Sequence, residues 1–187
     1  LQQDFNTFIS RKYRYKAKLS LKFMQTEICL EPFSYFNEWL FLYDNLIKRH
    51  SIKGLRAFSK ESFNLQMKIP EMILVVGKIQ DEVIAAMLIL IVNNVAYSHL
   101  TAFSDKAYSI SASYGLYLTA FNYLKEMNIK FFDVGASYGL ANSENDGLYQ
   151  FKSGWSNTKL MVYLCGCILD NEKYNELNQL KNINKND

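Results

Sequence analysis

Residues 72–102 read MILVVGKIQDEVIAAMLILIVNNVAYSHLTA, and this stretch predicts the centre of the structure. It holds three apolar runs, Met72–Ile79, Val83–Val92 and Val95–Ala102, which are joined by links of three and two polar residues. Such short polar links between β-rich runs predict an antiparallel meander. The second run is apolar over ten consecutive residues, which predicts a central strand covered on both faces.

The pattern after residue 102 becomes helical. Apolar residues recur at helical spacing up to Met127, and Ser109, Ser111 or Ser113 can cap the start of this helix. A short strand is predicted next, at Lys130–Val134. Because a strand, a helix and a strand follow one another directly, we expect a βαβ crossover that adds a parallel strand to the sheet.

The flanking segments complete the prediction of one α/β domain over residues 1–187, with a mixed sheet and helices on both faces. Upstream, the patterns predict helices at Phe5–Tyr15, Phe33–Arg49 and Lys60–Lys68 and a strand at Leu19–Leu30. Downstream, they predict a loop at Ala136–Asp146, a helical turn within Gly147–Trp155, a long strand at Thr158–Leu169, a helix at Glu172–Leu180 and a frayed tail at Asn182–Asp187.

Composition excludes several classes of protein. The chain is 49% hydrophobic and 15% aromatic with a formal charge of +3, which argues against extensive disorder. Its longest apolar run, Val83–Val92, is shorter than the roughly 20 residues of a membrane span. Three cysteines and the lack of a secretory signal predict a reducing, cytoplasmic location. The first residue is Leu1, so we expect a longer parent protein.

The N-terminal region is strongly basic. Residues 1–22 contain a single acidic residue, Asp4, and six basic ones, which are Arg11, Lys12, Arg14, Lys16, Lys18 and Lys22. This excess predicts either a solvated helix face or a surface that binds the phosphates of a nucleic acid, a nucleotide-linked substrate or an anionic lipid. Spacing alone leaves these alternatives open.

Two polar side chains lie on predicted strands. His99 is on the third meander strand, where alternation predicts that it shares a face with Val95, Tyr97 and Thr101. Asp133 lies near the end of the strand of the βαβ unit, where open α/β sheets place ligands. Its carboxylate is expected either to accept backbone hydrogen bonds or to orient a substrate. The sequence shows no His, Cys and carboxylate cluster, so we expect no metal site.

Lys152 lies in an unusual setting, the stretch DGLYQFKSGW at residues 146–155. Aromatic residues and glycines on both sides can hold its ammonium in a partly dry site, where a fixed cation stabilises negative charge more strongly than in water. The alternative is a lysine whose stem lies along aromatic surface while its head stays in water.

Taken together, these motifs resemble a known family. The run AYSHLTA (96–102), a helix, FDVG (132–135) and GLYQFKSGW (147–155) are similar to the Fem-type branch of the GNAT acyltransferases. That branch includes the peptidoglycan bridge-forming aminoacyltransferases and acetyltransferase-like domains of polysaccharide clusters. Residues 11–16, RKYRYK, resemble the segment that opens the second GNAT-like half of such proteins. The resemblance spans Arg11–Tyr174.

The resemblance implies a site and substrates. It implies a mixed sheet whose meander and βαβ unit splay apart to admit an acyl donor, and a lysine, here Lys152, that stabilises the tetrahedral intermediate. The candidate catalytic residues are then Lys152, Asp133 and His99, and the candidate substrate-binding residues are Tyr97, Tyr149, Phe151, Trp155, Arg11, Arg14 and Lys106. The implied donor is an acyl-CoA such as acetyl-CoA or an aminoacyl-tRNA, and the implied acceptor is an amine of a small-molecule or lipid-linked cell-wall or polysaccharide precursor.

The sequence also departs from the family pattern. Residues 104–115 lack the paired glycines of the loop that holds pyrophosphate in coenzyme A-dependent members, although helix amides and Lys106 are expected to hold a phosphate. The chain has room for one GNAT-like half, so an N-terminal half is expected outside it. A non-catalytic GNAT-like module that binds tRNA or a precursor is the main alternative, and a general nucleic-acid-binding domain is a third.

Overall fold

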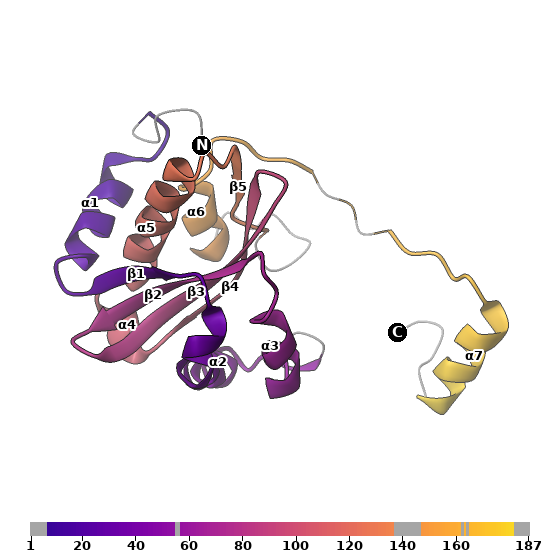
Figure 1. Ribbon diagram of the computed structural model, residues 1–187. Helices are drawn as coiled ribbons and strands as arrows, with labels where there is room; N and C mark the ends of the chain where they lie inside the picture. Colours follow the sequence, from indigo (N-terminus) through magenta and orange to yellow (C-terminus); the bar gives the residue numbers. More distant parts are fainter. Residues whose placement is uncertain (1–6, 55–56, 137–146, 162, 164, 182–187) are drawn as a thin grey trace. The chain divides into compact units, whose positions relative to one another are not determined.

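The computed structural model describes residues 7–54, 57–136, 147–161, 163 and 165–181 (Figure 1). The chain forms two compact units, residues 1–157 and 158–187. The first unit holds the whole sheet, and the prediction of a single domain over residues 1–187 stays a prediction. Among the described residues, no helix combines the length and apolarity that crossing a bilayer requires.

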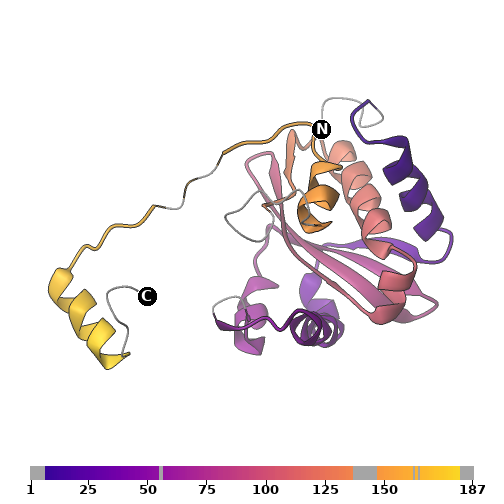
Figure 2. The same ribbon diagram turned by 180° about the vertical axis from the view of Figure 1, so that it is seen from behind.

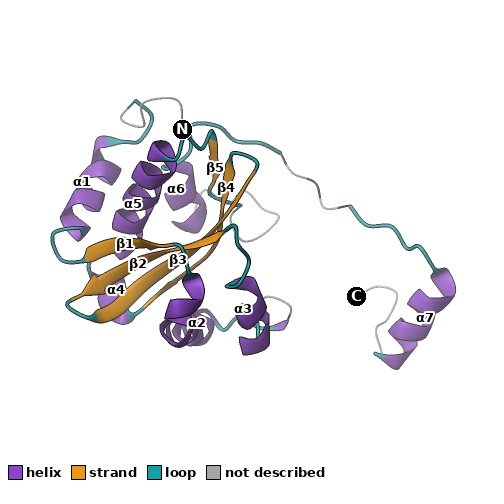
Figure 3. Cartoon of the chain, viewed as in Figure 1, coloured by secondary structure: helices purple, strands orange, loops and turns teal. Residues whose placement is uncertain are grey.

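The sheet has five strands in the order β1-β2-β3-β4-β5 (Figure 3). The strands β1 to β4 pair in antiparallel fashion, which confirms the predicted meander, and β5 pairs with β4 in parallel, which confirms the βαβ unit. Their bounds are Gln25–Cys29 (β1), Met72–Ile79 (β2), Glu82–Val92 (β3), Val95–Phe103 (β4) and Phe131–Asp133 (β5).

Helices cover both faces of the sheet, as predicted (Figures 1 and 2). One face carries α1 (Arg11–Ser20), α5 (Ala112–Glu126) and α6 (Gly147–Ser153). The other carries the short helix η1 (Pro32–Tyr35), α2 (Phe36–His50) and α3 (Lys60–Gln66). A further short helix, α4 (Asp105–Ser109), follows β4. We refer to the two sides as the α5 face and the α2 face.

Strand β3 is buried on both sides, which confirms the interpretation of its apolar run. Met87, Leu88 and Ile89 are all 0% exposed. Met87 and Ile89 belong to the core under α5, whereas Leu88 belongs to the core under α2. Successive side chains of a strand point to opposite faces, so a strand between two helical layers needs apolar residues at every position.

The helix α1 packs closely against α5 because Gly115 has no side chain. A Cβ at Gly115 would lie 2.5 Å from both Met24 Cε and Ser20 Oγ. Helix α1 begins at Arg11 because Ser10 caps it, with the Ser10 side chain accepting a hydrogen bond from the Tyr13 amide. The predicted strand at residues 19–30 is therefore shortened, since α1 continues to Ser20. Residues 5 and 6 of the predicted first helix lie outside the described residues.

The predicted strand at Thr158–Leu169 is wrong for the described residues of that segment. They are exposed and form no strand ladder, although their apolar pattern resembles that of β4. An apolar pattern predicts a strand only where a neighbouring backbone completes the ladder. Helix α7 (Asn171–Leu180) is close to its predicted range, and Asp170 caps it. The predicted tail and residues 137–146 of the predicted loop lie outside the described residues.

Candidate active site

The strand β5 is short and pairs with β4 over its whole length. Their register covers three residue pairs, from Val95↔Phe131 to Tyr97↔Asp133. The strand β5 ends there, whereas β4 continues to Phe103. The edge of β4 beyond Tyr97 is therefore not paired with β5, and an unpaired strand edge presents backbone N–H and C=O groups that an extended ligand can use.

The chain turns away from the sheet directly after β5. The Asp133 side-chain oxygen Oδ1 accepts a hydrogen bond from the Gly135 amide at 2.7 Å. Gly135 has a φ of +74°, in the left-handed region that favours glycine. This is the local bonding by which aspartate stabilises turns. The geometry of Asp133 thus follows the structural one of the two predicted alternatives.

The ammonium of Lys152 lies at this turn. Lys152 Nζ donates a hydrogen bond to the Ala136 carbonyl oxygen at 2.7 Å. A Cβ at Gly135 would be 3.2 Å from Lys152 Nζ and 3.9 Å from the Ser98 carbonyl oxygen. The cation therefore lies against the turn after β5, and Gly135 of that turn also lies near Ser98 of β4. A cation held there can stabilise negative charge on a carbonyl oxygen of a bound ligand.

An aromatic cluster supports the helix that carries Lys152. The ring of Phe151 lies 5.0 Å from that of Tyr117 on α5 and 6.2 Å from that of Tyr13 on α1, measured between centroids. Trp155 packs on Phe121 and is 1% exposed. The predicted role of Trp155 as a substrate contact is therefore corrected to one in packing, because its indole is enclosed by the core.

The glycine before the tryptophan of the motif, Gly154, is required by a close contact with Tyr13. A Cβ at Gly154 would overlap the ring of Tyr13. The Tyr13 hydroxyl donates a hydrogen bond to the Gln150 carbonyl oxygen at 3.0 Å. Two contacts from one tyrosine thus fasten α1 to α6, and the basic helix and the lysine motif form one packed unit.

A β-bulge at His99 changes the predicted alternation of β4. Leu88 pairs with Leu100, but the next residue of β3, Ile89, pairs with Ser98, so His99 is an extra residue. Thr101 pairs with Met87, which lies in the core under α5, whereas the His99 side chain contacts α3. The prediction that His99 and Thr101 share a face is therefore wrong, because strict alternation fails across a bulge.

The side chain of His99 lies on the α2 face, away from α6. Its Nε2 lies 2.8 Å from Gln66 Oε1, and Gln66 Nε2 donates to Ser62 Oγ at 2.7 Å. The Gln66 amide therefore bridges His99 and Ser62. The ring also packs near Phe58, and desolvation lowers the pKa of His99.

Two further residues lie beside the site, Ser98 and Tyr117, and neither was among the predicted site residues. The Ser98 and Tyr117 hydroxyl oxygens lie 3.5 Å apart, and burial raises the pKa of Tyr117. Ser98 is the residue of β4 at which pairing with β5 has just ended. No signal in the sequence marks this position, because it depends on where β5 stops and on the bulge at His99.

The other predicted residues lie on separate elements. Tyr97 is exposed on β4, Tyr149 is half-buried on α6, and Arg11 and Arg14 lie on α1. Lys106, on the five-residue helix α4, forms an ion pair with Glu82. It borders a cavity of about 650 Å³ between α2 and α4, whose lining includes none of Lys152, Asp133 and His99. The structure therefore does not bring Lys106 to the Lys152 site.

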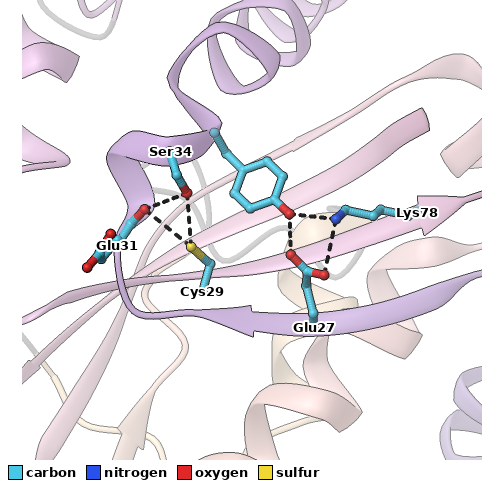
Figure 4. A network of polar contacts seen from close by, with 6 residues as sticks. Glu27, Cys29, Glu31, Ser34 and Lys78 are labelled. Carbon is cyan, nitrogen blue, oxygen red and sulfur yellow. Dashed lines mark hydrogen bonds and ion pairs between the residues drawn. The ribbon is translucent and has the colours of Figure 1, made fainter. Parts of the chain in front are cut away.

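A polar network lies at the other edge of the sheet (Figure 4). Lys78 Nζ is 3.1 Å from Glu27 Oε2 and 2.5 Å from the Tyr35 hydroxyl, which also donates to Glu27. The hydrogen bond from Tyr35 lowers the pKa of Glu27. The network fastens η1 to β1 and β2.

Within the described ranges, no three His, Cys, Asp or Glu residues form a group that could hold a metal ion.

Comparisons with known proteins give a structural likeness only. No family model and no curated protein matches this sequence. An aminoglycoside acetyltransferase from an uncultured soil metagenomic sample is similar, with 12% identity over 80% of this chain and 98% of that one and a TM-score of 0.60. FemX is also similar, with 13% identity over 82% of this chain and 56% of that one and a TM-score of 0.62. L-PGS from Bacillus licheniformis shares 23% identity over 81% of this chain and 54% of that one, with a TM-score of 0.58.

This chain has the GNAT fold. The mixed sheet and the order of the elements agree with the fold that the sequence resemblance implied. The expected splay between the meander and the βαβ unit stays a prediction, since all three residues of β5 pair with β4. Within this GNAT fold, Lys152 comes from the helix that follows β5 and reaches the turn at the end of that strand.

Replacing Gly154 by alanine is expected to lower the free energy of unfolding by about 1–3 kcal/mol. The new methyl group would overlap the Tyr13 ring, which cannot move freely because Tyr114 and Phe151 pack against it. Urea unfolding measures the loss. Gly147→Ala, at the start of α6, is the control, since a Cβ there meets nothing within 4 Å. Equal stability of the two variants would contradict the described packing.

The lowered pKa of His99 predicts a pH-dependent stability. The folded domain keeps the His99 imidazole neutral to a lower pH than the unfolded chain does. Below pH 6.5 the unfolded state therefore binds more protons than the folded state. The free energy of unfolding consequently falls as the pH drops. Between about pH 7.5 and about pH 5.5, wild type should lose more unfolding free energy than His99→Gln. The pKa of Glu27 is lowered from 4.5, so its contribution is lost only at lower pH. An identical pH dependence of both proteins would refute this environment for His99.

Proposed function

We propose that this protein is an N-acyltransferase that moves an acyl or aminoacyl group to an amine of a cell-wall or polysaccharide precursor. The observation that carries the proposal is the position of the Lys152 ammonium, 2.7 Å from the Ala136 carbonyl oxygen, at the turn after β5. The names of the structural neighbours, which include an aminoglycoside acetyltransferase and FemX, support the choice of reaction class.

The proposed mechanism relies on positioning and electrostatics. The donor lies along the open edge of β4 with its acyl carbonyl near Lys152. The acceptor amine attacks this carbonyl carbon, and negative charge develops on the oxygen, which the ammonium stabilises. The carbon–sulfur or carbon–oxygen bond of the donor then breaks, and the amine proton passes to the leaving group or to water. Asp133 acts on this geometry indirectly, by holding the turn at Gly135.

A non-catalytic module is the second candidate, and one observation favours it. All three candidate catalytic side chains are engaged by other groups of the chain. Asp133 bonds the Gly135 amide, His99 bonds Gln66, and Lys152 bonds the Ala136 carbonyl oxygen. A protein that only binds tRNA or a precursor for a partner domain would tolerate this arrangement. An enzyme tolerates it if the substrates supply the proton acceptor.

The whole protein is also part of the proposal. This chain spans about half of FemX and about half of L-PGS. We include in the proposal a second, N-terminal GNAT-like half outside this sequence, a cytoplasmic location, tRNA as a candidate partner and a lipid-linked or small-molecule amine as the acceptor.

A thermal-shift experiment tests the donor. Acetyl-CoA at about 100 times its Kd should raise the melting temperature by about 5–10 °C if it binds the native state. A rise only with aminoacyl-tRNA identifies that donor instead. Stabilisation by uncharged tRNA alone, without transfer to any amine, favours the non-catalytic module. A melting temperature that stays constant with every donor would refute the acyltransferase proposal.

A further inference from the structure

One face of α1 packs against α5 and α6, and this packing determines which face of the helix is exposed to solvent. Ala17 and Ser20 are buried against α5, and the Tyr13 ring contacts α6. Leu21 also packs on the core under α5. The opposite face of the helix, which we call the outer face, is therefore turned to solvent. Figure 1 shows α1 at the side of the first unit.

An exposed apolar ridge follows this outer face. Tyr15, Leu19 and Phe23 are 66%, 37% and 57% exposed. They are spaced four residues apart, so they lie on one side of the helix, one turn after another. The last of them lies just beyond α1, where the helical winding continues because the Phe23 amide donates to the Ser20 carbonyl oxygen at 3.0 Å. We call these three side chains the apolar ridge.

Basic residues flank the apolar ridge. Arg11 is four residues before Tyr15 and continues the line of the ridge, whereas at 100° per residue Lys18 and Lys22 lie on one side of that line and Lys12 lies on the other. All four basic residues are exposed. The sequence holds no acidic residue between positions 7 and 26, so nothing in this segment offsets their charge. The outer face thus combines an apolar centre with a cationic rim.

We infer that this face docks the protein on a bilayer surface rich in anionic phospholipid. Aromatic and leucine side chains enter the boundary between headgroups and acyl chains, while lysine and arginine reach outward to the phosphates. A nucleic acid would use the basic rim as well and would stack bases on the rings of Tyr15 and Phe23, but the aliphatic Leu19 between them offers no ring. The apolar ridge therefore favours the lipid.

This inference extends the proposed function by naming the surface at which a lipid-linked acceptor would be met. It does not depend on the proposed function for its test, because lipid binding is measured without a donor, an acceptor or turnover. Loss of transfer activity and loss of membrane binding can therefore be told apart.

The experiment uses the full chain and sedimentation with vesicles of phosphatidylcholine, with and without about 30% phosphatidylglycerol. Wild type should bind the anionic vesicles, bind the neutral ones much less, and dissociate as salt is raised. The variant Tyr15→Ser/Leu19→Ser/Phe23→Ser keeps every charge and should bind the anionic vesicles at least about tenfold less tightly.

The control variant is Phe41→Ser/Leu65→Ser/Met127→Ser, which removes three exposed apolar side chains elsewhere on the domain. It should bind like wild type, and equal melting temperatures verify that both variants are folded. Bulk tRNA is the competing probe. The inference is wrong if wild type does not bind the anionic vesicles, if the ridge variant binds them as wild type does, or if only tRNA binding is lost in the ridge variant.

Discussion

Replacing Lys152 by alanine is expected to lower the rate of acyl transfer about 10²–10³-fold, the usual loss when one donor to a developing oxyanion is removed. Donor affinity should change much less, because the contact strengthens only as charge develops on the oxygen. Folding should be little affected, since Phe151 and Trp155 carry the packing of this segment. The measurement is single-turnover transfer from the donor that the thermal-shift experiment identifies.

Two further variants make this test specific. Lys152→Arg keeps the charge but moves it, so a role that depends on position predicts a substantial loss of rate. Gly135→Ala would place a methyl group 3.2 Å from Lys152 Nζ and displace the ammonium. Gly54→Ala is its matched control, because Gly54 has a similar φ of +67° but open space around it. Equal rates for wild type and Lys152→Ala would end the oxyanion assignment, and an unfolded Lys152→Ala would show that the residue is structural.

Replacing Leu88 by aspartate is expected to remove most of the stability of the domain. Leu88 is 0% exposed on the central strand β3, in the core under α2. An unpaired carboxylate there costs on the order of 5 kcal/mol, comparable with the whole stability of a marginal domain. Urea unfolding and the soluble yield measure the effect.

Val92→Asp is the matched control for Leu88→Asp. Val92 ends the same strand but is exposed, so its carboxylate stays hydrated and should cost far less. A soluble Leu88→Asp protein that unfolds cooperatively with nearly wild-type stability would contradict the buried position of β3. Similar losses in both variants would show that the strand, and not burial, is sensitive to charge.

Much of the fold follows from local patterns in the sequence. Three apolar runs with short polar links leave an antiparallel meander as the simplest pairing, and the helix between β4 and β5 requires a parallel return. The same reasoning failed at residues 158–169, where the described residues form no strand. Whether an apolar segment pairs depends on a backbone partner elsewhere in the chain, which no local pattern contains.

For the candidate site, the sequence by itself determined that Lys152 lies among aromatic residues and glycines, and that Asp133 lies near the end of a strand. The tertiary structure alone decided what these residues contact. The bulge at His99 changes which side chains of β4 point to each face of the sheet, and Trp155 is enclosed by the core. Gly154 leaves room for the ring of Tyr13, which is 141 residues away in the sequence (154 − 13). These outcomes depend on contacts between distant segments, whose formation is governed by packing of the whole core and not by neighbours along the chain.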